Sequence, residues 1–295
     1  MGSKLHLINT GFACNNTCLF CAQGALRSSQ PAPAGDDILK TLQSAITKKN
    51  PAAAIAFVGG EPTLHDELPQ WISQAKTLGA DRVIIQTNGR RLAYQDFTAK
   101  LAEAGLDGMD VSLHGSTAAM HDYHTRVDSS WIQTLAGLKN AKNLGIKFGI
   151  TAVITRSNFR NLPEIAELAA ALGAAAIHFQ EALPLGTAAQ FAARVVPAEE
   201  LVSPYLAAAV ERARQLGLGV FSNATSSSDF SRSFFAGLGR TQPAAATAAA
   251  AAPTLQSPPK AKPGLAEIHR REKKTGADLK ELFPTLFERS PERAS

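Results

Sequence analysis

Cysteine is scarce in this sequence and confined to one short segment. Only three cysteines occur in 295 residues, and none follows Cys21. An odd number of thiols so close together (Cys14, Cys18 and Cys21) argues against a disulfide framework and favours a reducing compartment. The scarcity also excludes a cysteine-rich C-terminal segment and leaves no second cysteine pair for a typical zinc site.

Long apolar runs are also missing. No run approaches the ~20 residues that a membrane span needs. The N-terminal stretch MGSKLHLIN lacks the cationic segment and long apolar segment of a signal peptide. Hydrophobic residues make up 45% and charged residues 19%, proportions that suit a globular protein with a sizeable core. The sequence therefore predicts a cytoplasmic protein with no membrane partner.

Positive charge is sparse outside the C-terminal tail. The formal net charge is +5, but residues 240–295 hold ten Lys/Arg and six Asp/Glu, so 10 − 6 = +4 belongs to them. Only +1 remains for everything before. The basic character is therefore poor evidence for a nucleic-acid-binding face on the folded part, and a nucleic-acid partner is not expected.

Strand-like and helix-like segments alternate through the first 222 residues. Apolar, β-branched runs occur at 4–10, 53–59, 82–88, 109–114, 147–154, 176–183 and 219–224. Helix-like stretches occur at 37–49, 68–79, 94–105, 131–145, 162–173 and 197–217, and several of them end in glycine. This alternation predicts an α/β fold with a parallel sheet, either an incomplete barrel or an open doubly wound sheet.

The composition predicts three regions. Residues 1–236 form the folded core, and 237–264 read as an Ala/Pro-rich linker with almost nothing to pack. Residues 265–295 form a basic tail that resembles a short amphipathic helix. The tail is either a solvated extension or a docking peptide for a partner.

The three cysteines follow the first expected strand as Cys-x3-Cys-x2-Cys. A loop of this spacing can place three thiolates around an iron–sulfur cube, which normally has four cysteine ligands. With three, one iron keeps an open coordination position, as a catalytic zinc does. A zinc site completed by a distant histidine, or three buried thiols without a metal, are the alternatives.

Two motifs carry a resemblance to a known family. The segment CNNTCLFC (14–21) resembles the CxxxCxφC hallmark of the radical S-adenosylmethionine (SAM) superfamily, with Phe20 as the aromatic φ. The segment GGE (59–61) stands at the end of the second expected strand, as in that family. The likeness extends roughly from residue 4 to residue 224 and includes the order of strands.

The resemblance implies a fold, two cofactors and a chemistry. It implies a partial (β/α)6 TIM-like barrel that binds a 4Fe–4S cluster and SAM. One electron, from a reductant such as flavodoxin or ferredoxin, would cleave SAM, and the resulting radical would remove a hydrogen atom from a substrate. No cysteine follows Cys21, so we expect a single-cluster member without a SPASM or other auxiliary-cluster extension.

The resemblance also assigns roles to individual residues. Cys14, Cys18 and Cys21 would hold the cluster, and the cofactor-binding residues would be Phe20, Gly59, Gly60, Glu61, Thr87, Asn88, Ser112 and Arg156. Glu61 or a nearby carbonyl would accept from the SAM ammonium, and Arg156 would neutralise the SAM carboxylate. An apolar residue of the fifth strand, Ile150, Val153 or Ile154, would face the adenine.

Histidines gather in the segment SLHGSTAAMHDYHTR (112–126), which the alternation of elements leaves as a loop. His114 is the catalytic candidate, because it could hydrogen-bond a substrate or pass a proton. We expect His121 and His124 to be solvated loop residues.

The sequence thus predicts a radical SAM enzyme that abstracts hydrogen from a peptide or small metabolite. The alternatives are a tRNA-modifying radical SAM enzyme, which would carry a basic rim around the barrel mouth, and a non-catalytic module that binds the cluster or SAM. The C-terminal tail could recruit a partner or substrate.

Overall fold

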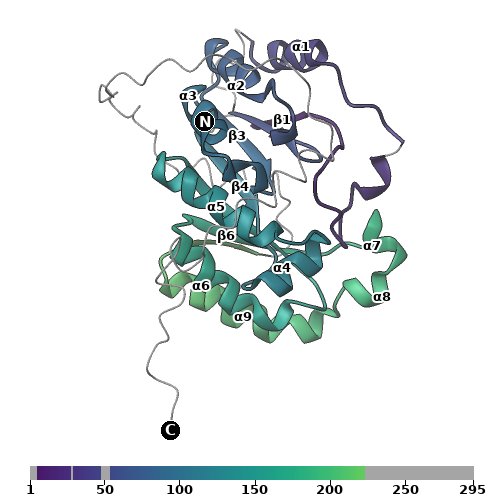
Figure 1. The fold of residues 1–295 in the computed structure, drawn as a ribbon. Helices are drawn as coiled ribbons and strands as arrows, with labels where there is room; N and C mark the ends of the chain where they lie inside the picture. Colours follow the sequence, from purple (N-terminus) through teal and green to yellow (C-terminus); the bar gives the residue numbers. More distant parts are fainter. Residues whose placement is uncertain (1–4, 28, 48–53, 223–295) are drawn as a thin grey trace. The chain divides into compact units, whose positions relative to one another are not determined.

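The computed structural model describes residues 5–27, 29–47 and 54–222 (Figure 1). The expected linker (237–264) and basic tail (265–295) lie outside these residues. Seven strands occur in the described part: β1 (Leu5–Asn9), β2 (Ala54–Val58), β3 (Arg82–Thr87), β4 (Gly108–Ser112), β5 (Lys147–Ile154), β6 (Ala176–Glu181) and β7 (Gly219–Ser222).

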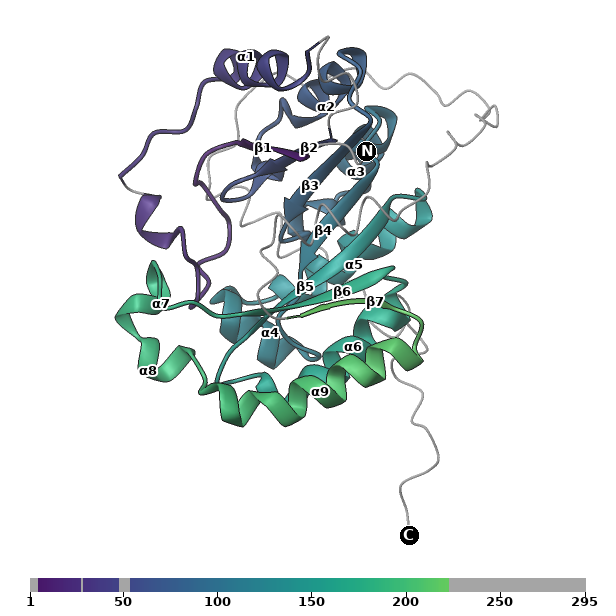
Figure 2. The ribbon, with the colours of Figure 1, turned by 180° about the vertical axis from the view of Figure 1, so that it is seen from behind.

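The strands form one parallel sheet in simple sequential order. Each strand pairs with the next in parallel register, from β1–β2 through to β6–β7. A doubly wound sheet would reverse its strand order at a switch point, whereas a barrel adds each strand beside the last. The order therefore selects the incomplete barrel, and the expectation of an α/β partial barrel is confirmed, with β7 added at its edge (Figure 2).

Helices connect successive strands. The longer ones in the described residues are α1 (Gly35–Ala45), α2 (Leu68–Thr77), α3 (Gln95–Glu103), α5 (Ser130–Asn143), α6 (Leu162–Leu172) and α9 (Glu199–Gln215). Their apolar faces cover the sheet: Ile72 of α2, Leu135 of α5 and Ile165 of α6 are fully buried. Such βα units bury the parallel strands and leave the strand ends to form the site.

The sequence analysis missed the helix that follows β4, as well as two four-residue helices after β6. Residues expected to be a loop form α4 (Ala118–Thr125). The Thr117 side chain caps its N-terminus by accepting from the Met120 amide, and Arg126 ends it in the left-handed conformation at φ 57°. The helix is short and only weakly amphipathic, so periodicity did not reveal it, although Thr117 is a standard N-cap residue.

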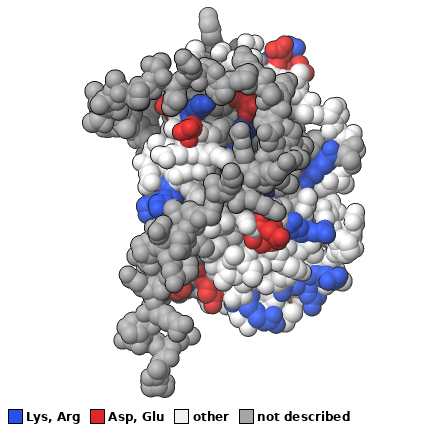
Figure 3. All heavy atoms as spheres, in the orientation of Figure 1, with Lys and Arg blue, Asp and Glu red and all other residues white. Residues whose placement is uncertain are grey.

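Charged residues are unevenly distributed over the described surface. In Figure 3, Lys and Arg side chains gather toward the lower right, where α4, α8 (Ala192–Val195) and α9 lie in Figure 1. The described residues include no helix that is both long enough and apolar enough to traverse a lipid bilayer.

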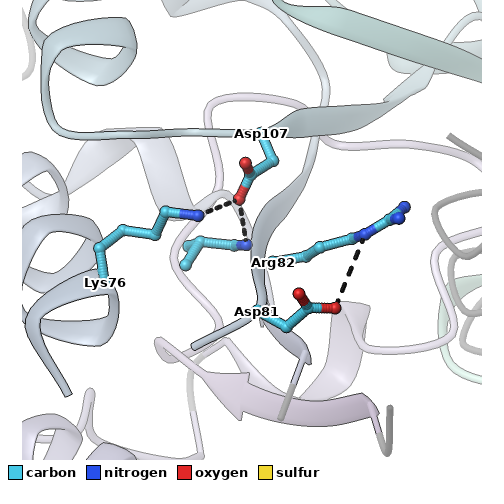
Figure 4. Close-up of polar contacts among 5 residues, drawn as sticks. Lys76, Asp81, Arg82 and Asp107 are labelled. Atoms are coloured by element: carbon cyan, nitrogen blue, oxygen red, sulfur yellow. Dashed lines mark hydrogen bonds and ion pairs between the residues drawn. The ribbon is translucent and has the colours of Figure 1, made fainter. Parts of the chain in front are cut away.

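Two ion pairs lie at the amino-terminal ends of β3 and β4, opposite the expected site. The Asp107 carboxylate, just before β4, accepts from Lys76 Nζ and from the amide of Val83 in β3, both at 2.7 Å (Figure 4). Arg82 and Asp81 form a second, longer pair at 3.9 Å. The Asp107 contacts tie the start of β4 to α2 and to β3.

Candidate functional site

The segment that carries the three cysteines leaves β1 and is held against α4. The amides of Thr17 and Leu19 donate to the carbonyls of Thr125 and His124, at 2.9 and 3.0 Å. These carbonyls belong to the last turn of α4, whose carbonyls have no partner within the helix. We call residues 14–21 the cysteine loop; α4, missed in the sequence, supplies part of its support.

The two glycines that follow β2 let the backbone of the cysteine segment pass close by. Gly60 donates to the carbonyl of Gly11 at 2.7 Å, and a Cβ added at Gly60 would overlap the Ala13 carbonyl. Gly59 has a φ of 133°, which side chains rarely adopt, and a Cβ there would overlap the Gly11 carbonyl. Both glycines are therefore required by the approach of the cysteine segment to the end of β2.

The carboxylate of Glu61 is buried and turned into the protein. Its Oε1 accepts from the hydroxyls of Thr63 and Thr87, both at 2.6 Å, and from the Thr63 amide at 3.1 Å. Its Oε2 accepts from the amide of Asn88 at 2.6 Å. The carboxylate thus accepts four hydrogen bonds, and those from Thr87 and Asn88 link the end of β2 to the end of β3.

Asn88 and Arg90, after β3, contact the cysteine loop. Asn88 Nδ2 donates to Asn15 Oδ1 at 2.6 Å and lies 3.8 Å from the sulfur of Cys14. Arg90 is 2% exposed, and its Nη1 donates to the carbonyl of Asn15 and to Asn16 Oδ1. A buried guanidinium thus orders the first turn of the loop through charge-assisted hydrogen bonds.

Arg27 approaches the cysteine loop from its other side. Its Nη1 donates to the carbonyl of Asn16, and its Nη2 lies 3.6 Å from the sulfur of Cys21. The sequence analysis did not single out Arg27, because no spacing or motif connects it to the thiols. The only feature of the sequence that could have pointed to Arg27 was its position six residues after Cys21.

Most of the expected site residues line one pocket at the carboxyl ends of the strands. Those that line it are Cys14, Cys18, Phe20, Cys21, Gly59, Gly60, Thr87, Asn88, Ser112 and His114. Val153 of β5 lines it too, while Ile150 and Ile154 are fully buried. Phe20 and Val153 pack against the buried Ala182 after β6, which gives the pocket an apolar side.

Two expected site residues do not line this pocket. Glu61 lies behind it, bonded as described above. Arg156 is exposed and donates to the carbonyl of Ala193 at 3.0 Å, so its guanidinium is directed toward α8. Arg27 is the only Lys or Arg among the residues that line the pocket.

The inner face of the sheet contributes polar residues that the sequence analysis missed. Gln86, Asp110, Thr151 and Gln180 line the pocket from β3, β4, β5 and β6. The Thr151 hydroxyl donates to Asp110 Oδ1 at 2.6 Å. The available signal was clearest in β4 and β6, where polar residues alternate as Asp110 and Ser112 and as His178 and Gln180, which places each pair on one face of the sheet.

The expectation that His121 and His124 are solvated was wrong: both are fully buried in α4. His124 Nε2 bonds the Thr155 hydroxyl at 2.7 Å, and the His114 amide donates to His121 Nδ1 at 3.1 Å. Burial lowers the pKa of all three histidines, that of His121 to about 3. The cluster is therefore neutral at physiological pH.

His114 has one ring nitrogen available to the pocket. Its Nδ1 accepts from the amide of Val153 at 3.2 Å, so the proton of the neutral ring lies on Nε2. The ring meets Phe20 edge-on, with centroids 4.6 Å apart, and stacks on His121. This arrangement makes His114 a fixed hydrogen-bond donor, because its pKa lies well below the ordinary value.

Burial also raises the pKa of the Cys14 thiol, to about 11, and that of the Cys18 thiol. For Cys14 the second cause is the negative charge of Glu61, and for Cys18 it is Cys14. Such thiols remain protonated unless a cation binds them, since a thiolate is otherwise poorly solvated here. The site therefore suits a strongly positive metal group.

Comparison with known proteins gives a consistent result. The profile of the Radical SAM superfamily matches residues 8–169. An AdoMet-dependent heme synthase from Oleidesulfovibrio alaskensis is 32% identical over 189 residues, 64% of this chain and 48% of that protein. A probable GTP 3′,8-cyclase from Sulfolobus acidocaldarius is 31% identical over 175 residues, 59% of this chain and 54% of that protein.

The fold has solved counterparts as well. The crystal structure of Streptococcus suis SuiB bound to precursor peptide SuiA is similar with a TM-score of 0.61, at 17% identity. The match covers 80% of this chain and 51% of SuiB. The chain thus spans about half the length of the curated relatives it matches, and the likeness to SuiB concerns the fold alone.

Proposed function

The chain belongs to the radical SAM superfamily, and from this premise we propose that it cleaves SAM reductively and abstracts a hydrogen atom from a peptide or small-metabolite substrate. The observation that carries the proposal is the shared pocket. The three thiols of the cysteine loop, the Gly59–Gly60 backbone and the polar inner face of the sheet all line it. We place this activity in the reducing cytoplasm, where thiols stay available to iron.

The donor set fits a 4Fe–4S cluster. Cys14, Cys18 and Cys21 supply three thiols from one short loop, and an iron–sulfur cube takes one thiolate on each of its irons. Among the described residues, no group of three His, Cys, Asp or Glu side chains is arranged to hold a single metal ion. When bound, the cluster supplies one electron, and SAM supplies the carbon radical that removes hydrogen.

The chain's own residues would bind SAM and exclude water from it. The apolar side formed by Phe20, Val153 and Ala182 suits the adenine ring, because it offers an apolar surface at the strand ends. The backbone at Gly59 and Gly60 and the Ser112 hydroxyl provide polar groups on the pocket wall. Glu61 would act by holding Thr87 and Asn88 in place.

His114 would orient the substrate. Its Nε2–H faces the pocket as a donor and has no hydrogen-bond partner among the described residues. A carbonyl or carboxylate of the substrate suits it. Because the ring stays neutral, His114 would hold a proton at Nε2 rather than exchange it during turnover.

The pocket does not favour the tRNA-modifying alternative. That function called for a basic rim at the barrel mouth, and Arg27 is the single Lys or Arg among the lining residues. The relatives are named for small-molecule reactions, which agrees with a small metabolite within the proposed substrate class. A non-catalytic cluster-binding module is the competing hypothesis.

Anaerobic reconstitution with iron and sulfide tests the proposal. Protein reduced with dithionite should convert SAM to 5′-deoxyadenosine, and Cys18→Ala should lose both this product and the brown colour of the cluster. Thr77→Ala on α2, outside the pocket, serves as the control. Protein that binds iron and SAM but releases no 5′-deoxyadenosine would be a binding module, and colourless protein with one zinc per chain would overturn the metal assignment.

A further inference from the structure

A second pocket lies against the outer side of the cysteine loop. It has a volume of about 310 Å³, and its lining includes Leu19, Tyr123, Arg126, Phe191 and Arg194. These residues come from the cysteine loop, the end of α4 and the segment after β6. We call it the arginine pocket. We call the pocket lined by the three cysteines the cofactor pocket. The two pockets share no lining residue, so the arginine pocket is not part of the site described above.

The arginine pocket is next to an expected cluster ligand. Leu19 lines it, while its chain neighbours Cys18 and Phe20 line the cofactor pocket. Consecutive Cα atoms are about 3.8 Å apart. A molecule seated on Leu19 is therefore separated from the Cys18 thiolate by little more than one residue of protein.

Two arginines, Arg126 and Arg194, line this pocket. Among the described residues, neither Arg126 nor Arg194 makes a side-chain hydrogen bond or an ion pair. The nearby carboxylate of Asp122 is already occupied by the amides of Ser129 and Trp131. Without such partners in the described part of the chain, the two arginines are available to an external anionic surface.

Exposed aromatic rings accompany the arginines. Tyr123 is 53% exposed and Phe191 is 43% exposed, although both are large side chains that gain from burial. Tyrosine, phenylalanine and arginine are the residues enriched where one protein docks on another. The basic surface in the lower right of Figure 3 continues this character around α8.

We propose that the arginine pocket is the docking site of an acidic one-electron donor protein of the flavodoxin or ferredoxin class. The inference rests on the proposed function, which needs one electron per SAM cleaved. The donor protein is oxidised by one electron and the cluster is reduced by one, with no bond made or broken between the two proteins. Arg126 and Arg194 steer the acidic donor, and Tyr123 and Phe191 pack against it beside Leu19.

The test compares a protein reductant with a chemical one on the full chain with its reconstituted cluster. Arg126→Glu and Arg194→Glu should each slow cluster reduction by reduced flavodoxin about tenfold at low salt, and the double variant should slow it further. Reduction by dithionite, and SAM cleavage driven by it, should stay unchanged. Arg214→Glu is the matched control, since Arg214 is exposed at the end of α9 and does not line the pocket.

The salt dependence gives a second readout. Wild-type reduction by flavodoxin should slow as salt is added, and this dependence should flatten in the double variant, because screening acts on the charges that were removed. Equal flavodoxin rates in wild type and double variant would overturn the docking site. So would a raised KM for SAM under dithionite, because these residues would then serve the SAM site. Failure of wild-type SAM cleavage under dithionite would instead count against the proposed function.

Discussion

The guanidinium of Arg27 donates a hydrogen bond to the sulfur of Cys21, with 3.6 Å between Nη2 and Sγ. The same guanidinium holds the carbonyl of Asn16, so its position is fixed from two sides of the cysteine loop. Hydrogen bonds to ligand sulfurs and nearby positive charge both favour the reduced form of an iron–sulfur cluster. In the proposed site, where Cys21 binds the cluster, Arg27 would make the cluster easier to reduce.

Arg27→Gln should lower the cluster midpoint potential by about 60 mV, which for one electron is roughly a tenfold change in the ratio of reduced to oxidised cluster. An anaerobic titration followed by electron paramagnetic resonance measures this directly. The midpoint potential of Arg27→Lys should lie between those of wild type and Arg27→Gln, since lysine keeps the charge but not the planar guanidinium. Arg91→Gln is the control, because Arg91 pairs with Asp66 away from the pocket. A potential that does not move in Arg27→Gln would contradict the assignment.

Glu61→Gln should destabilise the fold by about 1–3 kcal/mol, because one carboxylate oxygen becomes an amide that cannot accept from its buried donors. The amide of Asn88 and the hydroxyl of Thr87 would compete for the remaining oxygen. Urea unfolding of the anaerobic protein measures the loss. Thr63→Val removes a single donor to the same carboxylate, so it should cost less than Glu61→Gln. If Glu61→Gln were as stable as wild type while SAM affinity fell, the carboxylate would be a ligand group and not a structural one.

Gly60→Ala should prevent cluster assembly, because the added Cβ would overlap the carbonyl of Ala13 at the start of the cysteine loop. Iron and sulfide content per chain after reconstitution is the measurement, with circular dichroism to follow the fold. Gly35→Ala is a matched control: nothing lies within 4 Å of a Cβ there, and alanine is the better helix former at the start of α1. Full iron content in Gly60→Ala would contradict the steric account.

The sequence predicted the sheet well because its strands are near-continuous apolar runs bounded by turns. For β5 the expected and observed limits coincide at 147–154. It predicted less of the site, because the residues that support a loop come from distant elements. Arg90 and Arg27 bond the cysteine loop through carbonyl groups, which no motif records. Burial of His121 and His124 followed from a short helix whose only sequence signal was the cap at Thr117.

The buried histidines predict how stability depends on pH. Burial lowers the pKa of His121 from 6.5 to about 3, so between these values the unfolded chain binds a proton that the folded protein refuses. Stability should therefore rise with pH through this window and fall as the pH drops below about 6.5. The slope from one histidine is on the order of 1 kcal/mol per pH unit.

His121→Asn should reduce that slope, because asparagine carries no titrating group and its Oδ1 can still accept from the His114 amide in place of Nδ1. Urea unfolding of wild type and variant at about pH 5.5 and about pH 7.5 gives the comparison. The variant should lose less stability than wild type on acidification. His65→Asn is the control, since His65 lies outside the buried cluster and only packs beside Trp71. An unchanged slope in His121→Asn would mean that the ring protonates in the folded state, and His114 would then face a neighbouring cation at acidic pH.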